Sequence, residues 1–318
     1  MRDTHLSCIS RIYFPKPMTD QDKLLRFSFD KLDIRGELVY LDESWTNILS
    51  RHVYPPAVRR QLGDALAAVT LLSATIKFNG TMILQVQGEG PLRSLVVQIT
   101  NAGELRGLAR WEGIVPDGTL QDVYGDGRML ITINRQDGER YQSIVALEGD
   151  SLAAALNVYF LQSEQLPSSF QLYVHDNRVS GLFLQALPTS ERSQTMGTGP
   201  ALRDREEDWN RITVLAATLR EQEIFSLTAE QLLHNLFHEE DVLLHTPKSL
   251  RFACTCSRAK VERTLIAMGE EELRSIIHDE GSIKVDCEFC NQHYDFDSAD
   301  VDTLCNRGDS AGPGTVLH

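Results

Sequence analysis

Two closely spaced pairs of cysteines constrain this 318-residue chain more than any other feature. Cys254 and Cys256 are separated by one residue, and Cys287 and Cys290, with two residues between them, follow after a further thirty residues. Four thiolates complete the tetrahedral shell of Zn²⁺ at about 2.3 Å and leave no position open for a substrate. The spacing therefore predicts one structural Zn²⁺ per chain, bound by all four cysteines.

The same spacing allows an oxidised state. Two residues with one residue between them have Cα atoms roughly 6–7 Å apart, near the outer limit for a disulfide, so a Cys254–Cys256 bridge would be strained and easily reduced. We expect oxidation to join Cys254 to Cys256 and Cys287 to Cys290, because short loops cost the least closure entropy. A redox switch and a permanent zinc site both remain open from spacing alone.

Length and charge narrow the class of protein. With 318 residues, 42% of them hydrophobic, the chain is long enough for two or three domains. No apolar run reaches the ~18 residues of a membrane helix, and no secretory signal precedes the first domain, so we expect a cytoplasmic protein. The net charge is −14, and the chain from Cys254 onward carries thirteen acidic against six basic residues. This charge argues against nucleic-acid binding.

An α+β core domain is predicted over residues 20–187. Apolar spacing predicts a strand at 34–41, a long buried helix at 57–76 and a helix at 152–163. Alternating runs predict five antiparallel strands of one meandering sheet at 82–87, 95–99, 105–111, 129–133 and 141–147, and two further strands at 171–174 and 182–186. Strands and helices that follow one another in this irregular order are typical of the α+β class.

Four further segments are predicted. Residues 1–19 lack periodicity and are expected to be a disordered extension, residues 188–250 a flexible linker followed by metastable amphipathic helices, 251–300 the zinc-binding domain and 301–318 a disordered tail. The candidate switch and client-binding positions on the helices are Trp209, Ile212, Leu219, Leu232, Leu236 and Phe237. Such helices either dock on a core in the ordinary way or form a segment that is hidden only while another part holds it down.

The cysteine runs RFACTCSRAK and DCEFCNQHYDF resemble the C-terminal signature of the 33-kilodalton heat-shock chaperonin family, which are redox-regulated holdase chaperones. Other segments that are similar to the family, in the same order, are DIRGELVYL, VRRQLGDALAAVTLLSATIKFNG, ILQVQGEGPL, RGLARWEG, GERYQSIVALEGDSLA and YFLQSEQLP. The resemblance covers about Met18 to Phe296.

The resemblance implies a function that composition alone does not. It implies an ATP-independent holdase that is inactive when reduced and zinc-bound, active when oxidised, often dimeric, and able to bind unfolded or oxidatively damaged proteins. If the helices at 201–238 rest against the folded zinc segment, its loss would expose their apolar faces. We find no catalytic motif and expect no enzyme activity. A thiol-disulfide oxidoreductase and a zinc-ribbon binding module are the alternatives.

Overall fold

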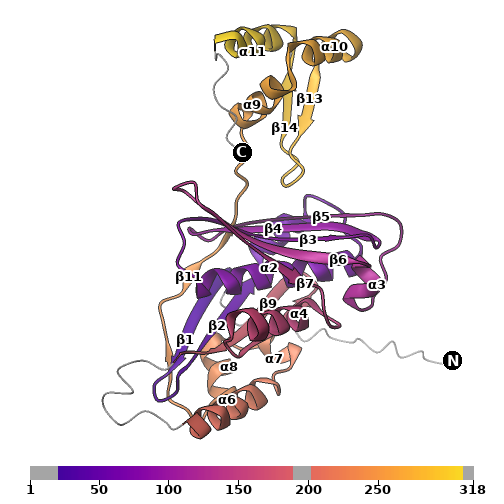
Figure 1. The fold of residues 1–318 in the computed structure, drawn as a ribbon. Helices are drawn as coiled ribbons and strands as arrows, with labels where there is room; N and C mark the ends of the chain where they lie inside the picture. Colours follow the sequence, from indigo (N-terminus) through magenta and orange to yellow (C-terminus); the bar gives the residue numbers. More distant parts are fainter. Residues whose placement is uncertain (1–20, 189–201, 311–318) are drawn as a thin grey trace, which may run out of the picture.

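The computed structural model describes residues 21–188 and 202–310. The predicted extension at 1–19 with Cys8, nearly all of the predicted Ser/Thr/Gly/Pro linker at 188–200, and residues 311–318 lie outside the described residues. The described part has the α+β class that the sequence predicts, with two sheets whose strands are antiparallel except for one short parallel pair, packed helices and a small C-terminal unit (Figure 1). No helix in it is long and apolar enough to cross a membrane.

Sheet A is built from strands that are far apart in the sequence. Its order is β10-β1-β2-β9-β8, and β11 also pairs with β1; all these pairs are antiparallel. The strands are β1 (Lys23–Phe29), β2 (Ile34–Leu41), β8 (Ser168–His175), β9 (Arg178–Ala186), β10 (Val242–Leu244) and β11 (Lys248–Ser249). The strands predicted at 171–174 and 182–186 therefore join the strand predicted at 34–41.

Sheet B holds the five strands that the alternating runs predict. They are β3 (Gly80–Gly88), β4 (Leu92–Thr100), β5 (Glu104–Trp111), β6 (Gly127–Arg135) and β7 (Arg140–Ala146), and β12 (Arg251–Phe252) joins β5 in parallel. The order β12-β5-β4-β3-β6-β7 corrects the expected simple meander. The segment with α3 (Leu120–Tyr124) carries the chain across the sheet, so that β6 pairs with β3 and not with β5.

Helix α2 (Pro56–Thr75) lies between the two sheets (Figure 1) and is buried along most of its length. Proline at the first helical position needs no hydrogen-bond partner for its nitrogen and favours the helical φ. The helix packs so closely on β5 that glycine is needed at position 107, since a Cβ there would meet Leu62 of α2 at 3.1 Å. Around this core lie α1 (Glu43–Leu49), α4 (Leu152–Tyr159) and the π-helical turn η1 (Phe160–Glu164).

Three helices cover the face of sheet A that points away from α2. They are α6 (Leu202–Ala216), α7 (Glu221–Ser226) and α8 (Ala229–Leu236), here called the helix cover. They dock on the core domain, which is one of the two alternatives that the sequence left open, and their buried side chains pack on sheet A and not on the zinc segment. The outward side chains of sheet A are apolar, among them Leu25, Phe27 and Leu38, so the helix cover buries its own apolar face there. The linker segment expected at 188–250 also ends early, because β10 and β11 form at 242–244 and 248–249.

The C-terminal module comprises residues 254–310. It contains α9 (Arg258–Met268), α10 (Glu270–Glu280), β13 (Ile283–Asp286), β14 (His293–Phe296) and α11 (Ser298–Ser310). The predicted disordered tail is therefore wrong for residues 301–310. Val301 and Leu304 are three residues apart, so a helix places both on one face, and there they are buried against Phe296. This burial stabilises α11.

Candidate metal centre

The structure brings the four predicted cysteines together. Their Sγ atoms all lie within 4.8 Å of one another, with Cys254 and Cys287 3.6 Å apart and Cys256 and Cys290 3.3 Å apart. Cys254 and Cys256 lie between β12 and α9, whereas Cys287 and Cys290 lie in the turn that joins β13 to β14. Two segments that are distant in sequence therefore build one cluster.

The turn between β13 and β14 is shaped to place two sulfurs side by side. The carbonyl oxygen of Cys287 accepts hydrogen bonds from the backbone N–H groups of Cys290 at 3.2 Å and Asn291 at 2.7 Å. Asn291 has φ of 55°, a left-handed conformation that asparagine tolerates better than most residues. The N–H of Cys287 donates to Gln292 at 3.0 Å and closes the turn. Both cysteines therefore face the CxC segment.

The geometry fits one structural zinc ion. A tetrahedron of sulfurs with bonds of about 2.3 Å has edges of about 3.8 Å, close to the sulfur separations found here. Thiolate sulfur is a soft ligand that favours Zn²⁺ over Mg²⁺ or Ca²⁺. All four cysteines are half-buried and free of disulfides, so each can contribute a donor.

Three of the four thiols have shifted pKa values, in different directions. Burial raises the pKa of Cys254, but hydrogen bonds from Cys256, Cys290 and Arg106 outweigh burial and lower the pKa to about 7. Burial raises the pKa of Cys287 and Cys290. The hydroxyl of Tyr294 donates to Cys256 Sγ at 3.2 Å, and this bond raises the pKa of Tyr294 to about 12. Of Cys254, Cys287 and Cys290, Cys254 therefore ionises most readily without a metal.

The cysteine turn contacts the outer face of sheet B through β5. The Nη1 atom of Arg106 lies 3.7 Å from Cys254 Sγ, and its Cζ lies 4.3 Å from the centre of the Phe289 ring. Arg110 forms an ion pair with Glu288, and a ring nitrogen of His52 lies 2.6 Å from the Glu288 carbonyl oxygen. Core and module thus meet at the candidate metal centre.

Sequence reasoning missed these arginines. Arg106 and Arg110 lie four apart in a strand predicted at 105–111, and a period of two places both on one face. Two arginines on one face of a strand are notable in a chain with a net charge of −14. The sequence shows this pair, but it does not show that the cysteines contact the same face, because that depends on the tertiary fold.

The predicted switch positions lie on sheet A and not beside the cysteines. Ile212, Leu232 and Phe237 are fully buried, Leu219 and Leu236 nearly so, and Trp209 packs against the same cluster from its edge. The ring of Phe237 lies 5.1 Å from that of Phe29 and 6.3 Å from that of Phe27, measured between centroids. These aromatic contacts form the centre of the interface between helix cover and sheet.

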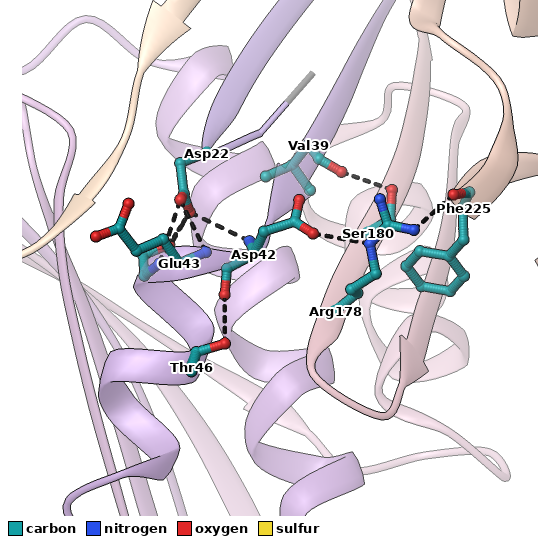
Figure 2. A network of polar contacts seen from close by, with 9 residues as sticks. Asp22, Val39, Asp42, Glu43, Thr46, Arg178, Ser180 and Phe225 are labelled. Atoms are coloured by element: carbon teal, nitrogen blue, oxygen red, sulfur yellow. Dashed lines mark hydrogen bonds and ion pairs between the residues drawn. The ribbon is translucent and has the colours of Figure 1, made fainter. Parts of the chain in front are cut away.

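A polar network also fastens the helix cover to the core (Figure 2). Arg178 of β9 donates from Nε to the carboxylate of Asp42 at 2.7 Å and from Nη1 to the carbonyl oxygen of Phe225, in α7, at 2.6 Å. Asp22 accepts from the backbone N–H groups of Asp42 at 3.2 Å and Glu43 at 2.9 Å, where α1 begins. One guanidinium therefore links α1, sheet A and the helix cover.

Comparisons with known proteins agree on one family. The family model described as Hsp33 protein matches residues 22–297. The chain is 50% identical over 301 residues to the 33 kDa chaperonin of Nitrosococcus oceani, which covers 95% of this chain and 100% of that protein. It is 41% identical over 292 residues to the 33 kDa chaperonin of Shewanella loihica, covering 92% and 98%. Among solved structures, a 33 kDa chaperonin from Thermotoga maritima has a similar fold, with a TM-score of 0.75, 22% identity, and coverage of 91% of this chain and 99% of that one.

Proposed function

Because this chain belongs to the Hsp33 protein family, we propose that it is a redox-regulated, ATP-independent chaperone that holds unfolding proteins under oxidative stress. The observation that carries the proposal is the cluster of four sulfurs within 4.8 Å of one another, formed by two segments of one small module. In this proposal the core domain, the linker with the helix cover, and the cysteine module act as separate parts of one switch.

The C-terminal module has little apolar core of its own. Its fully buried apolar side chains are Leu265, Leu273, Ile283, Phe296, Val301 and Leu304. A core of this size rarely stabilises a domain without a staple. Zn²⁺, when bound by Cys254, Cys256, Cys287 and Cys290, would hold the four sulfurs as thiolates and contribute on the order of 10–16 kcal/mol to folding.

Oxidation removes these donors. A thiolate, for instance that of Cys254, takes an oxygen atom from hydrogen peroxide and becomes a sulfenic acid, and the neighbouring thiolate then forms the S–S bond and displaces hydroxide. Each disulfide consumes one peroxide and two electrons from the two sulfurs. With the bridges Cys254–Cys256 and Cys287–Cys290, no metal-binding thiolate remains, and the module loses the ligand that stabilises it.

We infer that this loss is transmitted to sheet A by the chain between the helix cover and Cys254. Residues 242–252, here called the strap, run along both sheets as β10, β11 and β12, and Ala253 donates its N–H to Leu105 at 3.0 Å just before Cys254. These strands are two or three residues long, so few hydrogen bonds hold the strap. Unfolding of the module would free one end of the strap and weaken the attachment of the helix cover.

Release of the helix cover would expose the client-binding surface. The face of sheet A beneath it contains buried apolar residues, namely Leu25, Phe27, Phe29, Ile34, Leu38, Tyr40, Leu182 and Leu184. A contiguous apolar surface of this kind binds the apolar segments that unfolding proteins expose. Dimerisation of the oxidised chain, as the resemblance implies, would place two such surfaces in one particle.

Three measurements before and after peroxide treatment test this function: zinc content, the number of free thiols and suppression of client aggregation. Reduced protein should contain one zinc per chain and should not suppress aggregation of a denatured client. Peroxide should release the zinc, remove four thiols and switch suppression on. A Cys287→Ser/Cys290→Ser variant should lack zinc when reduced. Zinc retained in that variant, or turnover in insulin reduction in place of suppression, would reject the proposal in favour of another metal site or an oxidoreductase.

A further inference from the structure

The outer face of sheet B, which points away from α2, combines apolar and arginine side chains. Strand register places its side chains in rows across the sheet. One row is Leu108, Val96, Gln85, Leu130 and Ile144, and the next is Arg106, Gln98, Ile83, Thr132 and Gln142. Apolar residues therefore form a stripe from β5 to β7 in which Gln85 replaces an apolar residue on β3 and Ile83 of the next row lies beside it, and Ile144 at the end of the stripe is 67% exposed.

Four arginines border this stripe. Arg106 and Arg110 lie at the β5 end, and Arg128 and Arg140 are exposed at the β6 and β7 end. The acidic residue on this face, Glu104, pairs with Arg251 of the strap. Among the outward-facing positions of the paired strands, four arginines thus stand against one acidic residue, in a chain with a net charge of −14. Such a surface attracts negatively charged partners.

Side chains of the C-terminal module already bind to one end of this face. It covers the β5 end, where the carboxylate of Glu288 pairs with Arg110 and the ring of Phe289 lies against Arg106 (the module is above sheet B in Figure 1). An acidic residue followed by an aromatic one is therefore already bound there. The β6 and β7 end offers the same combination of arginine and apolar side chains.

We propose that the outer face of sheet B is a second docking surface, which binds an extended segment of an unfolded protein in which acidic and apolar residues alternate. This rests on the proposed function, because it names a class of client. Carboxylates of the segment pair with Arg128 and Arg140, and its apolar side chains cover Leu130 and Ile144. Departure of the module frees Arg106, Arg110 and Leu108 and lengthens the surface.

The test uses the full chain and two labelled peptides of about eight residues, long enough to cross the sheet. One alternates glutamate with leucine or phenylalanine, and the other has lysine in place of glutamate. We expect reduced protein to bind the acidic peptide weakly, at the β6 and β7 end that the module leaves uncovered, and not to bind the basic one; this contact is too short to hold a whole client and weakens further at high salt. We expect peroxide-treated protein to bind the acidic peptide more tightly, because the whole stripe is then free.

Matched variants locate the site. Arg128→Glu/Arg140→Glu should weaken binding of the acidic peptide roughly tenfold. Its control, Arg263→Glu/Lys284→Glu, makes the same charge change at exposed positions of the C-terminal module and should leave affinity unchanged. Ile144→Glu should weaken binding, whereas Val214→Glu, at a position that is 66% exposed on α6, should not.

Several outcomes would overturn the inference. Equal affinity for both peptides, or equal loss in the control variants, would show that binding does not involve this face. If Arg128→Glu/Arg140→Glu instead abolishes a concentration-dependent dimer in sedimentation, the occupant is a second copy of the chain. Peptide binding by the reduced protein needs no redox switch, so it separates failure of this inference from failure of the proposed function.

Discussion

Arg106 and Phe289 lie in contact across the boundary between the core and the C-terminal module, with the guanidinium carbon 4.3 Å from the ring centre. Arg106 is also held by Gln98, whose side-chain oxygen accepts from its Nε at 2.8 Å. The same guanidinium lies 3.7 Å from Cys254 Sγ. One side chain of sheet B therefore contacts both halves of the cysteine cluster.

We predict that peroxide activates the Arg106→Ala variant faster than it activates the wild-type protein. The substitution removes a cation–π contact worth about 0.5–1 kcal/mol at a partly exposed site, so the module should detach more readily. The half-time of zinc release and of activation by peroxide should fall about two- to fivefold, followed with a zinc indicator and an aggregation assay. Arg263→Ala, on the exposed side of α9, is the control. Equal half-times for Arg106→Ala and the wild type would contradict this role of Arg106.

Oxidation should form the Cys254–Cys256 and Cys287–Cys290 disulfides. In the reduced structure the sulfurs nearest in space include Cys256 and Cys290, at 3.3 Å, so proximity alone also permits cross-pairing. Loop closure favours the near neighbours once the module unfolds. Peptide mapping after peroxide distinguishes the two patterns. A dominant cross-pair would show that oxidation traps the folded arrangement instead, and a dominant bridge to Cys305 or Cys8 would also contradict the predicted pairing.

Ile212→Ser/Leu219→Ser should hold clients without any oxidant. Ile212 is fully buried and Leu219 is 7% exposed under the helix cover, so each substitution should cost roughly 2–5 kcal/mol. The helix cover should then open while zinc stays bound. Aggregation suppression by the reduced, zinc-loaded variant measures the effect, and protease cleavage between Arg203 and His238 confirms opening.

Val214→Ser is the matched control for that variant. Val214 lies on the same helix but is 66% exposed, so its loss should neither open the helix cover nor create activity. If protease shows the cover to be open in Ile212→Ser/Leu219→Ser and clients still are not held, the client surface is not the face of sheet A.

Glu37→Gln should make stability less dependent on pH. Glu37 is buried between sheet A and α2, and burial raises its pKa to about 7 although Arg35 and Arg26 oppose the shift. The folded state therefore binds a proton that the unfolded state releases near pH 4.5, and this residue's contribution to stability falls as pH rises from 4.5 to 7. Above pH 7 the variant should be more stable by up to about 3 kcal/mol.

Urea unfolding at pH 5 and pH 8 checks this expectation. The gain from Glu37→Gln should be large at pH 8 and small at pH 5, where the wild-type carboxyl is already protonated. A gain that is equal at both values would mean that Arg35, whose Nε lies 3.9 Å from the carboxylate, keeps Glu37 ionised throughout.

The sequence predicted the elements of this fold better than their arrangement. Periodicity located α2 and the five runs of sheet B because each depends on local alternation between buried and exposed positions. The predicted meander wrongly made β6 a neighbour of β5, whereas β6 pairs with β3, because the local sequence pattern does not show which strands pair. The helix at 298–310 was missed because its two buried residues, Val301 and Leu304, stand among polar ones in a sequence rich in Asp and Gly.

The cysteine cluster could be predicted because metal-ligand spacing is a local signal. The location of the helix cover could not. The amphipathic pattern of Trp209, Ile212 and Leu219 records that one face is buried, but it does not record the partner. The sequence left open whether that face docks on the core or is held down by another part of the chain, and the structure places it against sheet A. The cover and the metal centre are therefore joined by the strap and not by direct packing.

The strap closes one edge of each sheet at once. β10 and β11 pair with the edge strand β1, and β12 pairs with the edge strand β5, so a segment of eleven residues satisfies backbone donors and acceptors on both sheets. A sheet edge without its neighbour is a template for any extended chain, whatever its sequence. Detachment of the strap would thus give clients main-chain hydrogen-bonding partners in addition to apolar ones, and would oblige the opened protein to avoid pairing with itself.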